Sequence, residues 1–280
     1  MRKVILITGA SSGMGKSAAF QLLQEGHIVY GAARRVDEME DLRRAGAQII
    51  PLDLTQDESI ESCIRRILTQ ENQIDVLINN AGYGSYGAVE EVPIGEARRQ
   101  FEVNLFGLAR ITQLVLPGMR SQKSGRIIHI SSMGGRMYTP FGAWYHATKH
   151  ALEGWSDSLR LELRDLGIKV VVIEPGVIQT PWSDIAVNHL IKTSGKGPYA
   201  PSVRKFAEML QELYGHRRAT PPDELGRLIA HAATISRPRT RYAKGFLAKP
   251  AMVLRYWLGD RLYDQLFWKQ LNGLWIKKWR

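Results

Sequence analysis

A tyrosine and a lysine four residues apart form the pair with the clearest chemical potential in this 280-residue chain. Tyr145 and Lys149 share one face if the segment around them is helical. An ammonium group beside a phenol favours the phenolate and lowers the pKa of the phenol from its usual value of about 10. Such a phenol can give a proton to a carbonyl oxygen or take one from an alcohol. The spacing therefore predicts proton transfer at a carbonyl/alcohol pair.

A glycine-rich turn near the N-terminus supplies a second chemical signal. The apolar run at residues 4–7 leads into this turn and then into a helical pattern at 17–25. A strand, a glycine turn and a helix N-terminus together favour a dinucleotide phosphate site. The spacing is G-x-x-x-G-x-G, not the common G-x-G-x-x-G. We expect Gly9 to make the tight turn, Gly13 to let backbone N–H groups approach a pyrophosphate, and Gly15 to allow close helix packing.

Apolar runs rich in β-branched residues alternate with helical patterns along the chain, which is typical of βαβ units and a parallel sheet. Strands are expected at residues 4–7, 28–32, 48–52, 76–79, 126–130, 169–173 and 240–243. Helices are expected between them, notably at 94–119 and 143–166. This order predicts a doubly wound α/β Rossmann fold, in which ligands bind beyond the carboxyl ends of the strands.

The glycine turn and the Tyr145–Lys149 pair resemble those of the short-chain dehydrogenase/reductase family, and the resemblance runs from Lys3 to about Thr180. The chain also resembles the steroid- and retinol-acting branches of this family. The matching positions between the two motifs and after them are Asp53, Leu54, Asn79, Asn80, Ala81, Gly82, Asn104, Ser132, Pro175, Gly176 and Thr180. The resemblance implies hydride transfer between a nicotinamide cofactor and a carbonyl or alcohol, which requires no metal.

The resemblance also assigns roles to the reacting groups. Ser132 would hydrogen-bond the substrate oxygen, Tyr145 would move its proton, and Lys149 would hold the nicotinamide ribose and tune the phenol. Asn104 would keep a kinked helix and a water in place for proton relay. Ser131 competes with its neighbour, but the family places its active serine 13 residues before the tyrosine, which selects Ser132.

Two histidines beside the lysine are expected to have packing or surface roles. His146 and His150 are four residues apart, but no third ligand or glutamate pattern accompanies them, so no metal site is predicted. His146 stands where the family more often has a small residue. Because it should face away from Tyr145 on the helix, we expect a local packing effect and intact catalysis.

The resemblance implies a cofactor site built from several segments. Its contacts would be Gly9, Ser11, Ser12, Gly13, Met14 and Gly15 at the phosphates, Asp53 and Leu54 at the adenine, Asn80, Ala81 and Gly82 along the adenosine ribose, Tyr145 and Lys149 at the nicotinamide ribose, and Pro175, Gly176, Ile178 and Thr180 at the carboxamide. Residues 80–82 are alternatively a purely structural support for the central strand.

The end of the second expected strand indicates which nicotinamide cofactor is preferred. An NAD site usually offers an acidic residue here for the ribose 2′-hydroxyl, but this chain has Ala33, followed by Arg34 and Arg35. A guanidinium group can donate two hydrogen bonds to a 2′-phosphate, so NADP(H) is favoured over NAD(H), with Arg34 as the primary contact. Alternatively, both arginines are solvated loop charges, which the nearby Asp37 and Glu38 permit.

Bulk composition limits the class of protein. With 44% hydrophobic residues, the chain suits one α/β domain, which we expect at residues 1–249. The net charge is +11, but the basic residues are scattered without a recognition-helix pattern, so nucleic acid is not an expected partner. The single cysteine, Cys63, fits a reducing, cytoplasmic location. No apolar run reaches the length of about 18 residues that a membrane span needs.

Two segments fall outside the regular pattern. Glycines and prolines break the helical pattern at residues 177–220, which the resemblance implies to be a variable lid over the substrate. Residues 250–280 form an aromatic and basic extension, expected to be helical and to pack on or near the domain. It contains Trp257, Trp268, Trp275 and Trp279, interleaved with Arg255, Arg261, Lys269, Lys277, Lys278 and Arg280. Ordinary packing, a lid or subunit contact, and membrane association all fit this pattern.

An apolar wall near the reacting residues indicates the substrate class. It consists of Met133, Met137, Tyr138, Phe141 and Trp182, with few fixed charges. A hydrophobic ketone, aldehyde or secondary alcohol of steroid, retinoid or acyl type is therefore expected. Because the proton-relay residues are all present, a carbonyl reductase is favoured over a catalytically idle NADPH-binding sensor or scaffold. A peripheral membrane protein localised by its tail is a third hypothesis.

The resemblance also implies a homodimer or homotetramer. Its subunits would pair through the two long helices expected at 94–119 and 143–166. The second of these carries Leu152, Trp155, Leu159 and Leu163 at helical spacing, although one such stripe must also face its own sheet.

Overall fold

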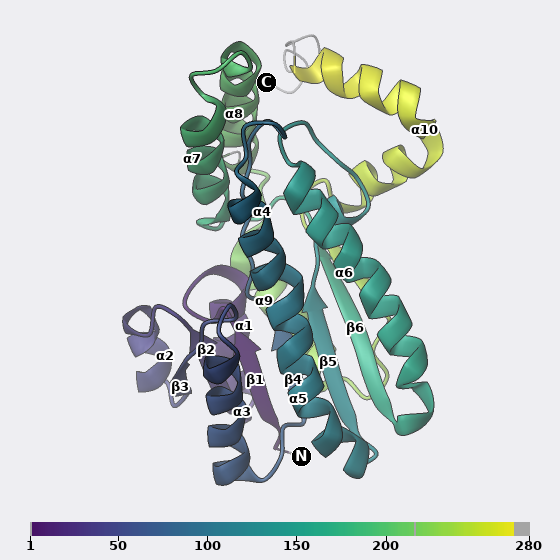
Figure 1. Ribbon diagram of the computed structural model, residues 1–280. Helices are drawn as coiled ribbons and strands as arrows, with labels where there is room; N and C mark the ends of the chain where they lie inside the picture. The colour runs from purple at the N-terminus through teal and green to yellow at the C-terminus, as the bar shows by residue number, and fades with distance from the viewer. Residues whose placement is uncertain (1, 216, 272–280) are drawn as a thin grey trace.

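The strands expected from the sequence form one parallel sheet between two layers of helices (Figure 1). The computed structural model describes residues 2–215 and 217–271. Within them the strands are β1 (Val4–Thr8), β2 (Ile28–Ala33), β3 (Gln48–Pro51), β4 (Val76–Asn79), β5 (Gly125–Ile130), β6 (Ile168–Pro175) and β7 (Arg241–Lys244). Their order is β3-β2-β1-β4-β5-β6-β7, so the winding reverses between β1 and β4. This confirms the doubly wound Rossmann fold, and ligands are expected at the reversal.

The continuous apolar runs in the sequence correspond to strands that are buried on both faces. Every residue of β1 and β4 is buried. Successive residues point to opposite sides of the sheet, so Ile7 and Ile78 enter one core while Leu6 and Leu77 enter the other. Burial on both faces explains why these strands lack the alternation of polar and apolar residues seen in half-exposed sheets.

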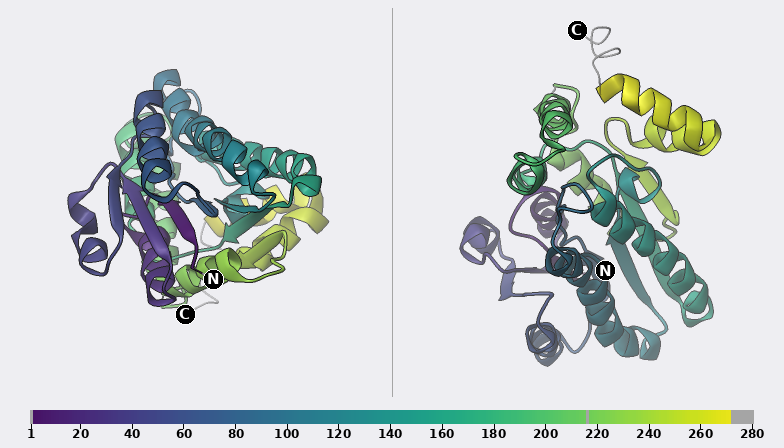
Figure 2. Two further views of the ribbon diagram at one scale, coloured as in Figure 1. Left: turned by 90° about the horizontal axis from the view of Figure 1, so that it is seen from below. Right: turned by 45° about the horizontal axis from the view of Figure 1, so that its top comes forward.

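Two layers of helices cover the sheet, as the view from below in Figure 2 shows. α1 (Gly13–Gln24), α2 (Glu40–Arg44) and α9 (Pro222–Thr234) pack on one face, and α3 (Asp57–Glu71), α5 (Gly107–Ser121) and α6 (Ala143–Glu162) on the other. α4 (Ile94–Phe101) joins α5 through one π-helical segment (Glu102–Phe106). Within the described ranges, single 3-10 turns lie at Asp37–Met39, Met133–Gly135 and Arg164–Leu166.

The remaining helices lie beyond the carboxyl ends of the strands, at the top of Figure 1. They are α7 (Trp182–Ser194), α8 (Ala200–Gly215) and α10 (Ala248–Leu271). The helix break expected within residues 177–220 occurs between α7 and α8. A lid function for this segment and a domain boundary at residue 249 remain predictions. Trp257 and Trp268 lie on α10, while Trp275, Trp279, Lys277, Lys278 and Arg280 lie outside the described residues.

The apolar stripe of α6 faces its own sheet. Leu152, Leu159 and Leu163 are buried, and Trp155 packs against the core beneath the helix. This is therefore the stripe that faces the chain's own sheet, and it gives no support for subunit pairing. None of the helices in the described ranges combines the length and apolar character that a bilayer span needs.

Candidate active site

The glycine turn joins β1 to α1 at the centre of the sheet. Gly9 has φ 68° and Gly13 has φ 58°, a region that favours glycine. A Cβ on Gly9 would lie 2.8 Å from the Cα of Ala81, and one on Gly13 would lie 3.1 Å from Cγ2 of Thr180. The turn is therefore packed between the segment after β4 and the segment after β6.

Hydrogen bonds fix this turn to the end of β4. The side-chain amide of Asn80 donates to the carbonyls of Thr8 and Gly9, at 3.0 Å each. In return, the Thr8 hydroxyl accepts from the backbone N–H groups of Asn80 (3.1 Å) and Ala81 (3.0 Å). Asn80 therefore supports the central strand, which is the structural alternative expected for residues 80–82.

The N-terminus of α1 provides an electropositive end at this turn. Ser12 makes no side-chain cap, and the first turn of the helix contains no acidic residue. The Arg35 guanidinium lies over the turn, where it donates to the Ser11 hydroxyl at 3.3 Å and pairs with Glu38 at 3.1 Å. Free N–H groups and a nearby cation suit an anionic phosphate.

Asp53 lies beyond the end of β3, near the arginines that follow β2. Its carboxylate accepts from the backbone N–H (3.0 Å) and hydroxyl (2.8 Å) of Thr55. Although burial opposes the shift, these hydrogen bonds and the charges of Arg34 and Arg99 lower the pKa of Asp53. Arg34 itself is exposed.

A cavity of about 90 Å³ lies where β1, β4, β5 and β6 end. Of the predicted site residues, it brings together Met14, Asn80, Gly82, Ser132, Tyr145, Lys149, Pro175, Gly176, Ile178 and Thr180. The others lie outside its lining, namely Gly9, Ser11, Ser12, Gly13, Gly15, Arg34, Arg35, Asp53, Leu54, Ala81 and Asn104. Chain segments far apart in the sequence therefore meet at one site.

Burial dominates the electrostatics of the reacting pair. Burial raises the pKa of Tyr145 to about 12, and its hydrogen bond with Ser132 opposes the rise. Lys149 Nζ donates to the Ile130 carbonyl at 2.8 Å. Burial lowers the pKa of Lys149 to about 8, against the opposing charge of Glu153. The expected lowering of the Tyr145 pKa is thus absent from this structure, because the phenol is desolvated and the ammonium is held at the end of β5.

Asn104 lies in the π-helical segment between α4 and α5. It is fully buried, its amide donates to the Tyr83 carbonyl (2.9 Å) and the Thr148 hydroxyl (3.1 Å), and its carbonyl accepts from the Tyr83 N–H (3.1 Å). π-helical turns are frequent at functional sites. Asn104 therefore connects the irregular helix to the loop that carries Gly82 and to the helix that carries Tyr145.

His146 has a larger role than packing alone. Its Nε2 accepts from the Thr139 N–H at 3.1 Å, so Nδ1 carries the proton that is shared with the Gly134 carbonyl at 2.9 Å. These bonds hold the loop after Ser132 against α6. Burial lowers the pKa of His146 to about 4, so the ring is neutral at pH 7.

This buried neutral ring predicts a specific loss of stability in acid. The folded-state pKa lies below the unfolded value of about 6.5, so the unfolded chain binds more protons as the pH falls from about 6.5 towards 4. Between about pH 7 and about pH 5, wild type should therefore lose about 2 kcal/mol more of its free energy of unfolding than His146→Gln loses. Urea unfolding at the two pH values measures this. His129, also buried and neutral, remains in both proteins, and a pH-independent difference would contradict the assignment.

Aromatic rings cover the phenol on the substrate side. The Tyr145 ring lies 5.1 Å from that of Trp182 and 5.8 Å from that of Tyr86, measured between centroids. Tyr214 of α8 packs on Trp182 at 5.7 Å. Trp182 was expected here, but Tyr86 and Tyr214 were missed because they come from segments without a recognisable motif. The expected wall residue Tyr138 instead packs on Tyr263 of α10, at 5.0 Å.

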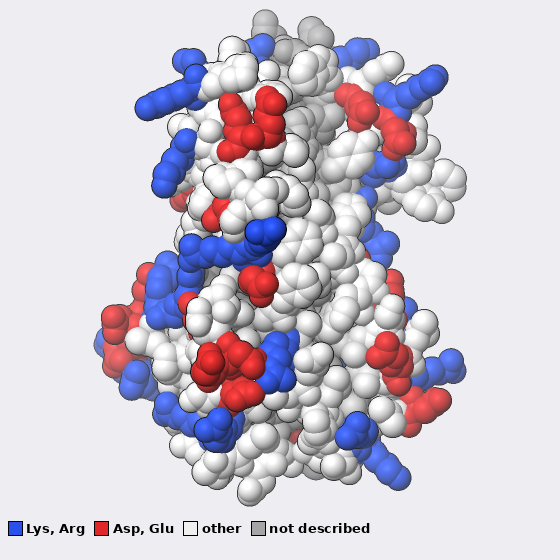
Figure 3. All heavy atoms as spheres, viewed as in Figure 1, with Lys and Arg blue, Asp and Glu red and all other residues white. Residues whose placement is uncertain are grey.

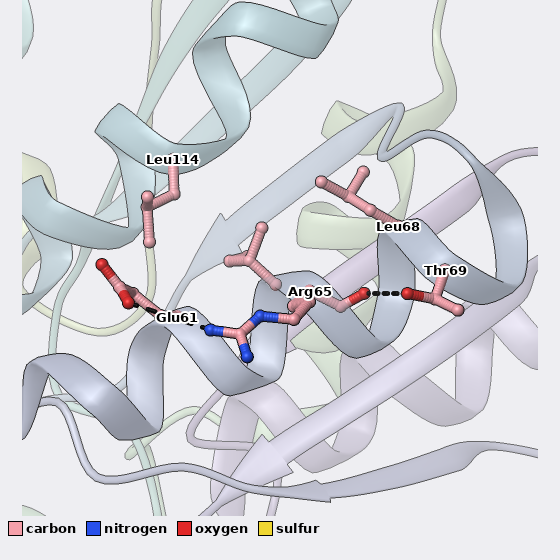
Figure 4. A pocket seen from close by; sticks show the side chains of 6 residues that line it. Glu61, Arg65, Leu68, Thr69 and Leu114 are labelled. Carbon is pink, nitrogen blue, oxygen red and sulfur yellow. Dashed lines mark hydrogen bonds and ion pairs between the residues drawn. The ribbon is translucent and has the colours of Figure 1, made fainter.

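A larger surface hollow of about 450 Å³ lies between α3 and α5 (Figure 4). Its lining combines Leu68 and Leu114 with the pair Glu61–Arg65, whose charged atoms are 3.9 Å apart. The hollow lies on helices, away from the strand ends, and contains none of the predicted site residues. The smaller cavity is therefore the candidate active site.

The residues around the smaller cavity fit a nicotinamide dinucleotide. The α1 N-terminus and Arg35 can hold phosphates, and Lys149 projects beside Gly82, where an added Cβ would lie 3.7 Å from Nζ. Gly82 thus leaves room beside the ammonium that a side chain would fill. Residues 2–215 and 217–271 contain no cluster of three or more His, Cys, Asp or Glu side chains arranged to hold a metal.

Comparison with known proteins places this site in context. Residues 3–189 match the family model described as short chain dehydrogenase. The chain is 33% identical to the probable short-chain type dehydrogenase/reductase VdlC of Helicobacter pylori, with 94% of this chain and 95% of the relative covered. It is 34% identical to a 3-ketodihydrosphingosine reductase of Bacteroides thetaiotaomicron (93% and 94% covered). An NADPH-dependent 3-dehydrocapnine reductase of Ornithobacterium rhinotracheale is 31% identical (96% and 97% covered).

Solved structures show the same architecture. A short-chain dehydrogenase from Streptomyces avermitilis superposes with a TM-score of 0.80 at 31% identity, covering 96% of this chain and 97% of the other. The closed form of a serine dehydrogenase complexed with NADP+ superposes with a TM-score of 0.75 at 25% identity, covering 92% and 98%. The similarity thus extends over nearly the whole chain, including the helices beyond the strand ends.

Proposed function

This chain belongs to the short-chain dehydrogenase/reductase family, and on that premise we propose that it is an NADPH-dependent reductase of a ketone borne on a long apolar molecule. As a family member it is an oxidoreductase that acts on CH–OH or C=O groups with a nicotinamide cofactor. The narrower steroid- or retinol-type substrate remains a prediction.

The observation that carries the substrate class is the aromatic wall beside Tyr145. Trp182 and Tyr86 pack on the phenol ring, and behind them Tyr214 packs on Trp182 and the buried Phe206 packs on Tyr86. Such a wall favours a substrate with a large apolar part and a single polar carbonyl. The two relatives named for 3-ketodihydrosphingosine and 3-dehydrocapnine support a ketone carried on a lipid chain.

The reacting residues divide the chemistry among them in this proposal. The bound nicotinamide supplies the hydride. Ser132 donates a hydrogen bond to the carbonyl oxygen, and Tyr145 transfers its phenolic proton to that oxygen as negative charge develops there. Lys149 holds the nicotinamide ribose and, once engaged there, favours the phenolate that remains. Asn104 holds the helix geometry behind them through the π-helical turn.

Preference for NADPH is proposed to come from Arg34 and Arg35. Ala33 provides no carboxylate to bind the 2′-hydroxyl, and the two guanidinium groups follow it directly. Arg35 donates a hydrogen bond to Ser11, so one of these cations lies beside the glycine turn, which supports this proposal. A 2′-phosphate between them would receive charge-assisted hydrogen bonds, which are stronger than neutral ones.

A ketone panel followed by NADPH absorbance tests the function. We expect kcat/KM for 3-ketodihydrosphingosine to exceed that for a short acyclic ketone at least about a hundredfold, because each buried methylene contributes about 0.8 kcal/mol. Tyr145→Phe serves as the inactive control for non-enzymatic oxidation. Equal values for the two ketones would exclude the long-chain substrate, and NADPH binding without turnover of any ketone would indicate an idle sensor.

We also propose a homodimer or homotetramer formed through α4, α5 and α6. Ile94 and Phe106 on this side of the molecule are each 53% exposed, unlike the buried stripe of α6. Light scattering is expected to give a mass of at least two chains, and Phe106→Asp should lower it because a carboxylate would be buried without a partner. A monomeric wild-type protein at micromolar concentration would exclude this assembly.

A further inference from the structure

We propose that the outer face of α10 docks on an anionic lipid surface. This face, called here the α10 aromatic face, consists of Val253, Leu254, Tyr256 and Trp257. Their side chains are 55%, 44%, 79% and 77% exposed. At 100° per residue these four positions lie within one side of the helix. A cluster of exposed apolar side chains on one helix face marks an interaction site.

The opposite side of α10 is fixed to the domain. The Arg255 guanidinium lies 5.0 Å from the ring centroid of Tyr138 and 5.7 Å from that of Tyr263. The Tyr263 hydroxyl donates to the Tyr138 carbonyl at 2.9 Å, and the Tyr138 hydroxyl donates to Asp264 at 2.8 Å. These contacts orient the helix, so its aromatic face points away from the protein.

Charge favours a lipid surface over a second copy of this chain. Between Lys249 and Arg280 the sequence has seven basic and two acidic residues, which contribute five of the eleven net positive charges. Both acidic residues are already engaged, Asp260 with Arg255 at 2.6 Å and Asp264 with Tyr138. Two chains that each carry this excess of basic residues in the same segment of sequence repel each other there, whereas anionic headgroups attract it.

The residue types match an interfacial position. Tyr and Trp rings prefer the boundary between headgroups and acyl chains, and lysine and arginine reach the headgroups beside them. In Figure 3, α10 lies at the upper right, where uncharged side chains protrude beside basic and acidic groups. Gly259, with φ 64°, bends the helix directly after this face, so the two halves follow different directions.

An aromatic path connects α10 with the reacting phenol. Phe267 of α10 lies 6.3 Å from Phe206, which lies 6.2 Å from Tyr86, which lies 5.8 Å from Tyr145, between ring centroids. These rings belong to one hydrophobic cluster, so continuous apolar packing joins the second half of α10 to the wall of the active site. The lipid surface thus supplies both the docking partner and the phase in which a long-chain ketone dissolves.

Vesicle binding of the full chain tests this inference without using turnover. We compare wild type, Tyr256→Ser/Trp257→Ser and the matched control Tyr256→Phe/Trp257→Phe. Each is sedimented with phosphatidylcholine vesicles with and without phosphatidylglycerol. We expect wild type to bind the anionic vesicles, the serine variant to bind at least about tenfold more weakly, and the phenylalanine variant to stay within about threefold of wild type. Added salt should weaken wild-type binding because the cations are screened.

Three results would overturn the proposal. The first is the absence of wild-type binding to anionic vesicles, and the second is equal binding by the serine and phenylalanine variants. The third is a lower mass of the assembly in solution for the serine variant alone, which would assign the face to a subunit contact. The serine variant should give the far-ultraviolet circular dichroism spectrum of wild type, which shows that the variant is folded. Because vesicle binding is measured without substrate, failure here leaves the proposed reductase activity standing, and failure of the ketone panel leaves the docking surface standing.

Discussion

Replacing Tyr145 by phenylalanine is expected to lower kcat about a thousandfold while changing the Kd for NADPH by less than about threefold. The phenol oxygen is the proton donor in the proposed reaction, whereas the ring only fills space between Trp182 and Tyr86. Phenylalanine keeps that ring, so the wall and the cavity persist. Steady-state turnover and fluorescence titration of NADPH measure the two effects separately.

Tyr214→Phe is the matched control for this substitution. Tyr214 lines the same cavity and is partly buried, but it is assigned no proton transfer, so removal of its hydroxyl should change kcat by less than about fivefold. Similar losses in the two variants would show that the activity depends on packing and not on proton donation. A loss of NADPH affinity as large as the loss of kcat in Tyr145→Phe would also reject the assigned role.

The pH dependence of turnover follows from the same residue. Because burial raises the pKa of Tyr145 to about 12, the phenol stays protonated through the neutral range and is ready to donate. Reduction is then expected to fall only at strongly basic pH, while the reverse oxidation, which needs the phenolate, rises with pH. Tyr145→Phe is expected to remove the pH dependence of both reactions.

Arg34→Ala is expected to weaken NADPH binding about ten- to a hundredfold and to leave NADH binding within about threefold. Only NADPH carries the 2′-phosphate, and a lost charge-assisted hydrogen bond costs about 1.5–3 kcal/mol. The exposed position of Arg34 also means that salt screens the contact, so the wild-type preference for NADPH should decline as ionic strength rises. Fluorescence titration with each cofactor at low and high salt measures both effects.

Arg44→Ala provides the control for a simple loss of charge. Arg44 is an exposed arginine on α2 that pairs only loosely with Glu40, at 3.9 Å. Its removal lowers the net charge by the same amount and should affect both cofactors equally and slightly. If Arg34→Ala behaves like this control, or if wild type already prefers NADH, Arg34 is a solvated loop charge. The absence of a carboxylate at Ala33 would then have no bearing on cofactor choice.

Local patterns in the sequence determined most of the fold and the centre of the candidate site. Every strand was expected within a few residues of its position, and the central strands are continuous apolar runs because both of their faces are buried. The glycine turn and the Tyr145–Lys149 pair were equally local signals, since their meaning depends on spacing alone. The order of these elements was enough to bring them to the carboxyl edge of one sheet.

The tertiary structure decided what depends on distant neighbours and on burial. Lys149 and Tyr145 share a helix face as expected, yet desolvation sets both pKa values, and desolvation comes from segments far away in the sequence. His146 became a loop clamp because Gly134 and Thr139 fold back onto α6. The leucines of α6 and the rings of α10 are both apolar patterns on helices. The leucines are buried between α6 and the sheet, whereas Tyr256 and Trp257 of α10 are exposed to solvent. A sequence records the apolar character of a side chain, whereas only the fold determines what covers it.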